Sequence, residues 1–402
     1  MNSNIFKIEK LDHLGRGIVK INNKTTFVEN ALPMDIVKVS KKSEKKNYII
    51  GKVDSFIESS PLRREFCTYS SICGGCDICN LKYYEQLAYK EDKIRNIVNK
   101  YLKGKVDINN ILYDKDREYR NKITLHICDD KLGFYKKESN NIVEIESCTL
   151  ADNEINEAIK KIRFFLSNYD NDLKSVVIRT SSLKELMINF KGVVNEDDVA
   201  NYFSFADSLS LNDKVLKKGY IKESIGSFEF LIYPNSFFQV NLFNTINLYN
   251  EVKRLTYGKK YNKILDLYCG TGTIGIILSD VSKKVIGIEI ITDAIVAANK
   301  NKEINNIKNI DFICGRVEDN IDKFNDADLI VVDPPRSGLD NKTIDNILRI
   351  RPKEIIYVSC DPMTLVRDLN LLGSEYKSLE LTPVDMFPNT HHVECVCLLK
   401  LR

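Results

Sequence analysis

The second half of the chain alternates short apolar runs with stretches whose apolar residues recur at helical spacing. Strands that are apolar throughout are buried on both faces, as in a parallel sheet that helices cover on each side. The pattern therefore predicts a doubly wound, Rossmann-like α/β domain over residues 236–402. The apolar runs are KILDLYCG, KVIGIEI, NIDFICG, ADLIVVDPP and EIIYVSCDP.

The first part of the chain, residues 1–58, contains short alternating runs such as GRGIVKI and YIIGKVDSFI with turn signals between them. This spacing, together with Gly15 and Gly17, favours a small OB-like β-barrel over helices. The lysine-rich stretch SKKSEKK is interpreted either as a solvated hairpin tip or as a loop that contacts phosphates.

Residues 59–235 form the predicted central domain. The run YYEQLAYKEDKIRNIVNKYL has helical spacing without Gly or Pro, which predicts a helix at about 82–103. Residues 118–235 mix strand-like runs with one helical stretch and lack βαβ regularity, which is typical of an α+β domain. The fold class is therefore multidomain α/β in three parts.

The composition is that of a globular protein, with 43% hydrophobic and 29% charged residues among 402. The formal net charge of +3 does not identify a partner, because basic residues can still gather on one face. The sequence contains no run of about eighteen apolar residues and no signal-peptide core. We therefore expect a cytoplasmic protein without a membrane partner.

The cysteines of the second segment have metal-ligand spacing. Four of them fall in a C-x5-C-x2-C-x2-C pattern at Cys67, Cys73, Cys76 and Cys79, and Cys148 follows in EIESCTL. Reduced thiolates at such spacing hold either zinc or an iron–sulfur cluster, and the spacing alone does not distinguish the two. The pattern predicts a metal site with five candidate ligands for four positions.

A glycine loop follows the first apolar run of the C-terminal domain. Gly270, Gly272 and Gly275 have G-x-G-x-x-G spacing, and Glu289 ends the next run about twenty residues later. Such a loop lets a ligand approach the backbone closely, while the acid binds ribose hydroxyls. Both a dinucleotide and S-adenosylmethionine satisfy this pattern.

Two further side chains, Asp333 and Cys360, are predicted at the same edge of the sheet, and Glu394 falls in the last predicted strand. Asp333 precedes two prolines in VVDPPRSGL, and Cys360 ends a strand just before Asp361. A cysteine in a strand is usually a small core residue, but one at a strand end beside a ligand loop can act as a nucleophile. Glu394 interrupts the apolar run VECVCLL, so it is either a water-facing residue on an edge strand or a buried general base.

These motifs together resemble those of the RNA 5-methyluridine (uracil-C5) methyltransferases of the RumA and TrmA type. SFFQVN, LDLYCGTGTIG, DPPRSGL, SCDP and HHVECV stand in the family's order. The resemblance extends to the N-terminal segment, which is similar to a TRAM domain, and to the cysteine-rich segment, which is similar to the family's iron–sulfur site. It implies a class I methyltransferase domain at the C-terminus, against which the helix at about 82–103 packs.

The resemblance also implies a mechanism. Cys360 matches the nucleophile that adds to C6 of uracil, and Glu394 matches the base that removes the proton from C5. The residues expected to bind S-adenosylmethionine are Gln239, Tyr268, Gly270, Glu289 and Asp333, with Phe237 lining the pocket. The implied ligands of a [4Fe-4S] cluster are Cys67, Cys73, Cys76 and Cys148, which leaves Cys79 as a spare thiol.

The implied partner is RNA, with the target uridine in a loop or flipped out of its helix. The TRAM-plus-cluster architecture resembles the branch that acts on 23S rRNA, and we expect a monomer. A tRNA uridine remains an alternative target. Arg336, where amino-group methyltransferases have an aromatic residue, disfavours methylation of a base amine. A nicotinamide-dependent oxidoreductase and a non-catalytic RNA-binding module are the remaining alternatives.

Overall fold

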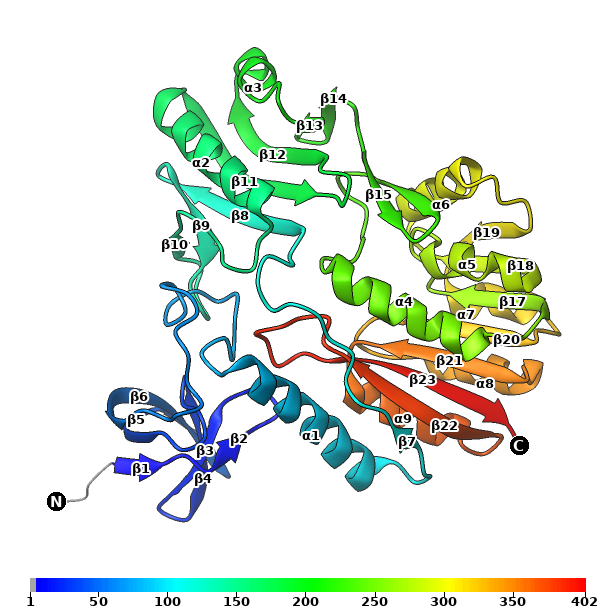
Figure 1. The fold of residues 1–402 in the computed structure, drawn as a ribbon, viewed down its shortest axis with the longest axis horizontal. Helices are drawn as coiled ribbons and strands as arrows, with labels where there is room; N and C mark the ends of the chain where they lie inside the picture. Colours follow the sequence, from blue (N-terminus) through cyan, green and yellow to red (C-terminus); the bar gives the residue numbers. More distant parts are fainter. Residues whose placement is uncertain (1–4) are drawn as a thin grey trace.

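A computed structural model describes residues 5–402, whose strands form sheets of six, seven, two and eight strands (Figure 1). The six-stranded sheet has the order β1-β5-β6-β4-β3-β2 and surrounds a small core that includes Ile8, Val28 and Val37. Closure of this sheet into a barrel, and its identity as a TRAM domain, stay predictions. Its strands are β1 (Ile5–Lys7), β2 (Lys10–Leu11), β3 (Gly17–Ile21), β4 (Lys24–Glu29), β5 (Ile36–Glu44) and β6 (Tyr48–Glu58).

The central sheet is mostly antiparallel, with the order β10-β9-β8-β11-β12-β13-β14. One face packs against α2 (Asn153–Asn168) through residues such as Ile155 and Ile159. The sequence predicted one helix here, and the structure adds the short α3 (Glu196–Tyr202), which Asn195 caps. The strands are β8 (Lys122–Cys128), β9 (Lys131–Tyr135), β10 (Ile142–Glu144), β11 (Asn171–Thr180), β12 (Leu186–Val194), β13 (Ser208–Leu211) and β14 (Lys214–Lys217). The hairpin of β15 (Ile221–Ile225) and β16 (Phe228–Ile232) follows.

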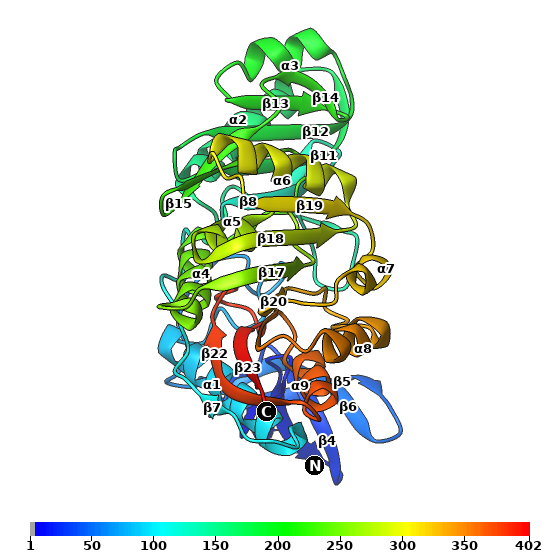
Figure 2. The same ribbon diagram turned by 90° about the vertical axis from the view of Figure 1, so that its right-hand side faces the viewer.

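The C-terminal sheet has the order β19-β18-β17-β20-β21-β23-β22-β7. Its first five strands are parallel: β17 (Tyr261–Leu267), β18 (Ser282–Glu289), β19 (Ile310–Cys314), β20 (Leu329–Val332) and β21 (Glu354–Ser359). Figure 2 shows β19, β18, β17 and β20 side by side. The strand order reverses between β17 and β20, which is where doubly wound sheets bind ligands. β23 (Glu394–Leu401) runs antiparallel between β21 and β22 (Tyr376–Val384).

Helices cover both faces of this sheet, as its continuously apolar strands require. Along β17, Leu265 and Leu267 face one core, while Ile264 faces the other. The helices of the C-terminal part are α4 (Leu242–Thr256), α5 (Thr273–Ile277), α6 (Thr292–Ile304), α7 (Val317–Asn320), α8 (Asn341–Ile350) and α9 (Pro362–Leu372), with short 3-10 turns at Ser279–Val281 and Ile321–Lys323.

An early segment of the chain is built into this C-terminal domain. The helix α1 (Tyr83–Tyr101) buries Leu87, Ile94 and Val98 in the core that includes α9. After it, β7 (Asp107–Ile108) extends the sheet by pairing with β22. Within residues 5–402, no helix is long and apolar enough to cross a membrane.

Candidate active site

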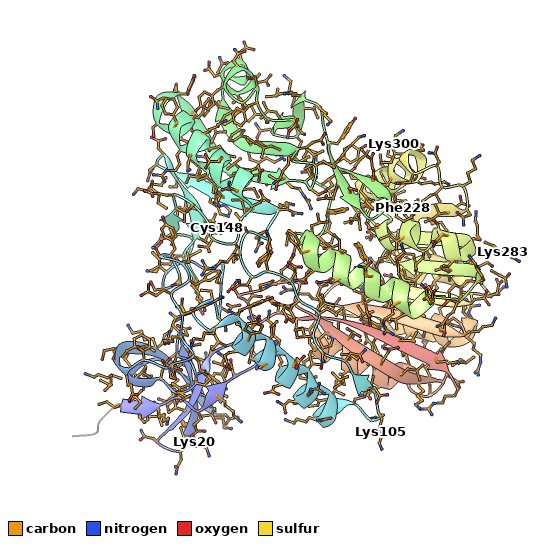
Figure 3. The ribbon with its side chains drawn as sticks, viewed as in Figure 1. Lys20, Lys105, Cys148, Phe228, Lys283 and Lys300 are labelled. Carbon is orange, nitrogen blue, oxygen red and sulfur yellow. The ribbon has the colours of Figure 1, made fainter. Side chains whose placement is uncertain are left out.

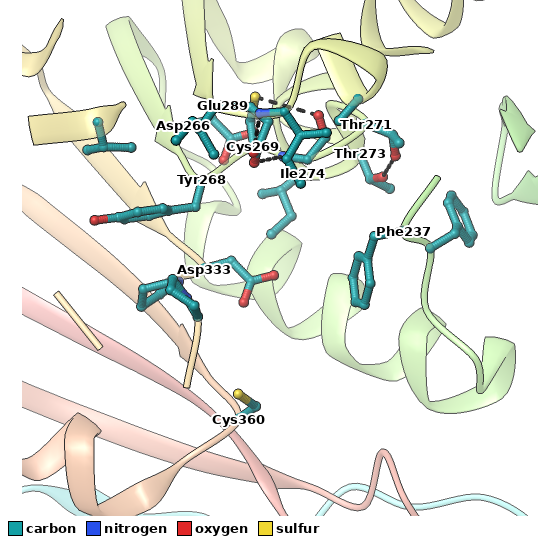
Figure 4. Close-up of a pocket in the computed structure, with 18 of the residues that line it drawn as sticks. Phe237, Asp266, Tyr268, Cys269, Thr271, Thr273, Ile274, Glu289, Asp333 and Cys360 are labelled. Carbon is teal, nitrogen blue, oxygen red and sulfur yellow. Dashed lines mark hydrogen bonds between the residues drawn. The ribbon is translucent and has the colours of Figure 1, made fainter. Parts of the chain in front are cut away.

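A pocket of about 780 Å³ opens at the carboxyl ends of the parallel strands, a size suited to a nucleoside-like ligand. The ends of β17, β18, β20 and β21 and the loops that follow them contribute Tyr268, Glu289, Asp333 and Cys360 to its lining. The structure therefore brings together the side chains that the sequence predicted at this edge. Figure 4 shows Asp333 and Cys360 facing the same space beneath the glycine loop, with Phe237 across from them.

The glycine loop needs its glycines for conformation and for space. Gly270 and Gly272 have φ values of +52° and +79°, which lie in the left-handed region that glycine adopts at little cost. A Cβ on Gly272 would lie 2.5 Å from the ring of Phe312. The Gly270 amide donates to Glu289 Oε2 at 3.1 Å, which joins the loop to the end of β18.

Glu289 is held by backbone groups alone. Its second oxygen, Oε1, accepts from the Ile291 amide at 2.9 Å. A carboxylate oxygen has two lone pairs, so each oxygen keeps one for a further donor. Glu289 therefore lines the pocket with acceptor capacity to spare, and its binding of ribose hydroxyls stays a prediction.

The pairing of β21 with β23 places Cys360 beside Glu394. Ser359 and Cys395 are the last paired residues of the two antiparallel strands, so Cys360 and Glu394 are the next positions in the same register. Both residues line the pocket. Glu394 begins β23 rather than interrupting it, and β23 is an internal strand. The alternative of a water-facing Glu on an edge strand is therefore wrong, since the residue is only 6% exposed.

Burial without partners changes the acidity of the carboxylates. Burial, with the charge of Asp333 second, raises the pKa of Glu394 to about 8. Burial also raises the pKa of Asp333 to about 7. Glu394 Oε2 has no hydrogen-bond partner within residues 5–402. A cationic ligand would relieve this cost, so the pocket favours a positively charged group such as a sulfonium.

The pKa of the Cys360 thiol is raised above that of an ordinary cysteine. Burial, together with the charges of Glu394 and Asp333, raises its pKa to about 11, and Arg336 opposes the rise. Cys360 is half-buried, which differs from the fully buried Cys395 and Cys397 of the neighbouring strand. Exposure to the pocket separates Cys360 from an ordinary core cysteine.

The remaining predicted residues also reach the pocket. Gln239 and Phe237 line it from the loop before α4, and Phe237 is 68% exposed. Tyr268 lines it with a φ of +62°. Sequence reasoning missed Asp266, which is buried in β17 and accepts from the Gly275 amide at 2.8 Å. A carboxylate inside the apolar run KILDLY was the signal that could have found it.

The thiols of the predicted metal site lie around one small apolar cluster. Cys79 is buried in it, and three more thiols pack at its edge: Cys67, Cys76 and Cys148. Burial, with the neighbouring thiols Cys148 and Cys67, raises the pKa of Cys73. Cys148 lies where the central sheet meets the cysteine-rich segment (Figure 3).

This donor set has the chemistry of an iron–sulfur site. Within residues 5–402, however, no three His, Cys, Asp or Glu side chains form a group that could hold a metal ion. The thiols therefore lie near one small apolar cluster but do not form a metal-binding group among the described residues, and the iron–sulfur cluster stays a prediction.

Comparisons with known proteins find relatives of this chain. A family model described as tRNA (uracil-5-)-methyltransferase matches residues 210–402. An uncharacterized RNA methyltransferase of Clostridium tetani is 36% identical, and the match covers 96% of this chain and 93% of that protein. A similar relative in Clostridium acetobutylicum is 33% identical over 98% of this chain and 96% of its own length.

A solved structure matches almost the whole chain. It is the Pyrococcus abyssi tRNA (uracil-54, C5)-methyltransferase in complex with S-adenosyl-L-homocysteine, with a TM-score of 0.83 and 31% identity. The match covers 98% of this chain and 100% of that one, so it includes the N-terminal sheet and the cysteine-rich segment.

Glu394→Gln should stabilise the fold while removing the carboxylate. Below the ordinary pKa of 4.5 the residue is protonated in both the folded and unfolded states, and the destabilisation grows as pH rises toward its folded pKa of about 8. The melting temperature of the variant should therefore exceed that of the wild type by about 2–4 °C at pH 9 and match it near pH 4.

Glu354→Gln is the matched control, because Glu354 is also buried but binds Lys259 at 2.7 Å and Tyr261 at 2.8 Å. Its substitution should lower the melting temperature. A Glu394→Gln variant that melts at or below the wild-type temperature at pH 9 would show that burial does not strain this carboxylate.

Proposed function

The chain belongs to the family of S-adenosylmethionine-dependent RNA uracil-C5 methyltransferases, and we propose that it methylates C5 of a uridine through a covalent bond between Cys360 and C6. The observation that carries the proposal is the shared register of Cys360 and Glu394 at a pocket that also contains the glycine loop. A nucleophile and a base must both reach one pyrimidine ring, and neighbouring strand positions satisfy that requirement.

The thiolate of Cys360 adds to C6, and the electrons of the C5–C6 double bond move into the ring to form an enolate. C5 then has carbanion character and takes the methyl group, which S-adenosylmethionine supplies from its sulfonium. Glu394 removes the proton from C5, the C5–C6 double bond forms again, and the Cys360 thiolate leaves. A carboxylate with a pKa of about 8 is a stronger base than an ordinary glutamate, which suits this last step.

The cofactor residues have separate tasks in this proposal. Glu289 accepts from the ribose hydroxyls, and the glycine loop gives the ligand close access to the backbone at Gly270. The negative lining at Asp333 favours the cationic sulfonium over the neutral thioether product. Gln239 and Tyr268 line the same volume and would fix the orientation of the ligand.

We propose 23S rRNA as the substrate, on the resemblance of the barrel and cysteine segment to those of the ribosomal branch. A tRNA uridine is the second candidate, and a specific observation favours it. The Pyrococcus abyssi tRNA enzyme aligns over its full length with this chain, so the three-part architecture alone does not separate the two RNA classes. In either RNA the uridine must leave its stack to enter the pocket.

RNA that contains 5-fluorouridine should trap the enzyme. Fluorine at C5 cannot be removed as a cation by Glu394, so after methyl transfer the bond to Cys360 should survive denaturation. A denaturing gel with S-adenosylmethionine should show a protein–RNA adduct, which Cys360→Ala abolishes. The exposed cysteine at the end of β19 supplies the matched control, since Cys314→Ala should form the adduct normally.

Running the same gel with 23S rRNA fragments and with tRNA transcripts identifies the RNA class. An adduct with 23S rRNA alone supports the first substrate, and an adduct with tRNA alone supports the second. Complete absence of an adduct, or equal amounts with Cys360→Ala, would contradict the covalent mechanism.

A [4Fe-4S] cluster held by Cys67, Cys73, Cys76 and Cys148 is a further part of the proposal, supported by the gathering of these thiols at one place. Protein purified without oxygen should be brown and contain about four iron atoms per chain. Cys148→Ser should lose the iron, whereas Cys79→Ser should keep it. A colourless protein with one zinc ion would contradict the assignment.

A further inference from the structure

The segment from Asp385 to Val393, named here the base loop, joins β22 to β23 and leads directly into Glu394. Most of its residues are buried although it contains no helix or strand. A buried irregular segment must find partners for its backbone polar groups outside itself. The identity of those partners shows which parts of the molecule determine the path of the loop.

The start of the base loop is bound to α1 and α4. Asp385 accepts from Lys90 Nζ at 2.5 Å and from the Tyr83 hydroxyl at 2.8 Å. Lys90 also donates to the Phe387 carbonyl at 3.0 Å, and Asn244 donates to the Asp385 carbonyl at 2.7 Å. Lys90 and Asp385 are both fully buried. Because a buried charge without a partner destabilises the fold strongly, each of these two charges needs the other.

The side chain of Asn389 is bound by three separate segments. Its Oδ1 accepts from Arg64 at 2.6 Å and from Gln86 of α1 at 3.1 Å. Its Nδ2 donates to the Asp116 carbonyl at 2.7 Å, and its backbone amide donates to Gln86 Oε1 at 2.9 Å. The side chain is completely buried, so each of these bonds forms away from water.

The carbonyl of Asn389 connects the base loop to the cysteine-rich segment. It accepts from the amides of Asp77 and Ile78, each at 3.1 Å. Asp77 Oδ2 also lies 2.6 Å from His391 Nδ1, further along the loop. With φ at +70°, Asn389 has the left-handed conformation that asparagine tolerates better than most residues. Asn389 and His391 therefore join the loop to the segment around Cys76.

By contrast, little binds the base itself. Glu394 Oε2 has no hydrogen-bond partner within the described part of the chain. The position of the carboxylate therefore follows from its backbone, which the pairing of β23 fixes on one side and the base loop on the other.

We propose that Asn389 is a positioning residue for the base, through which α1 and the cysteine-rich segment hold Glu394 where it can reach C5 of the uridine. This inference rests on the proposed function, in which Cys360 adds first and Glu394 acts last. A displaced Glu394 leaves addition and methyl transfer unaffected but slows removal of the C5 proton. The methylated uridine then stays bonded to Cys360, so the covalent complex accumulates with ordinary RNA.

Asn389→Gly tests this role, because it removes the side chain and keeps the freedom to adopt a positive φ. With uridine RNA and S-adenosylmethionine, kcat should fall by at least about tenfold, as misplacement of a reacting group predicts. Because breakdown of the adduct becomes rate-limiting, KM for RNA should fall together with kcat, so that kcat/KM stays nearly constant, and the fraction of enzyme in a denaturation-resistant adduct should rise. Asn306→Gly is the control at an exposed asparagine with φ of +55°, and it should change none of these values.

Two further variants keep the test decisive. Asn389→Asp keeps the shape of the side chain and the acceptor for Arg64 but loses the donor to the Asp116 carbonyl. If Asn389→Gly does not fold, Asn389→Asp should still raise the adduct fraction, by a smaller amount. Arg64→Met should also raise the adduct fraction. Combined with Asn389→Gly, it should add less than its separate effect, because both act through one contact.

Glu394→Gln separates the two levels of the proposal. If Glu394→Gln accumulates adduct and the Asn389 variants do not, the positioning role is overturned and the proposed function stands. If Glu394→Gln accumulates none, the assignment of the base fails, and the role of Asn389 fails with it. A fall in kcat of Asn389→Gly without a rise in adduct would show that the residue serves only folding.

Discussion

The antiparallel pairing of β21 with β23 is the contact on which the active site depends. A parallel sheet delivers the glycine loop, Asp333 and Cys360 to one edge, because the carboxyl ends of its strands meet there. It does not by itself place a carboxylate opposite Cys360. Inserting β23 in the opposite direction brings the start of a strand to that same edge, and Glu394 is its first residue. The antiparallel strand β23 thus adds Glu394 to the pocket that the parallel strands form.

The cost of this arrangement is a group of acids buried with few partners. Asp333 and Glu394 share the pocket, and burial raises the pKa of both. Burial disfavours the charged forms of these acids, which destabilises the fold as pH rises through their raised pKa values. In the proposed function, the same acids favour a cationic methyl donor over its neutral product. In that proposal, stability, ligand preference and proton transfer all depend on Asp333 and Glu394.

Much of the C-terminal domain could be predicted from the sequence, because buried parallel strands leave continuous apolar runs that end at Gly270, Asp333 and Cys360. The placement of Glu394 beside Cys360 depends on the register of two strands distant in sequence, which no local pattern encodes. Asp266 was missed because the run KILDLY was interpreted only as a buried strand, with no role given to the single acid inside it. The base loop was also unpredictable, since the partners of Asn389 come from three separate segments.

The most direct test of the central claim is to follow the C5 hydrogen during methyl transfer, using RNA with tritium at C5 of its uridines. If Cys360 and Glu394 act as described, each methyl group transferred releases one tritium to water, and Glu394→Gln transfers methyl groups without matching release. Methylation by the wild-type protein that leaves the tritium in the RNA would place the methyl group on another atom and contradict the account.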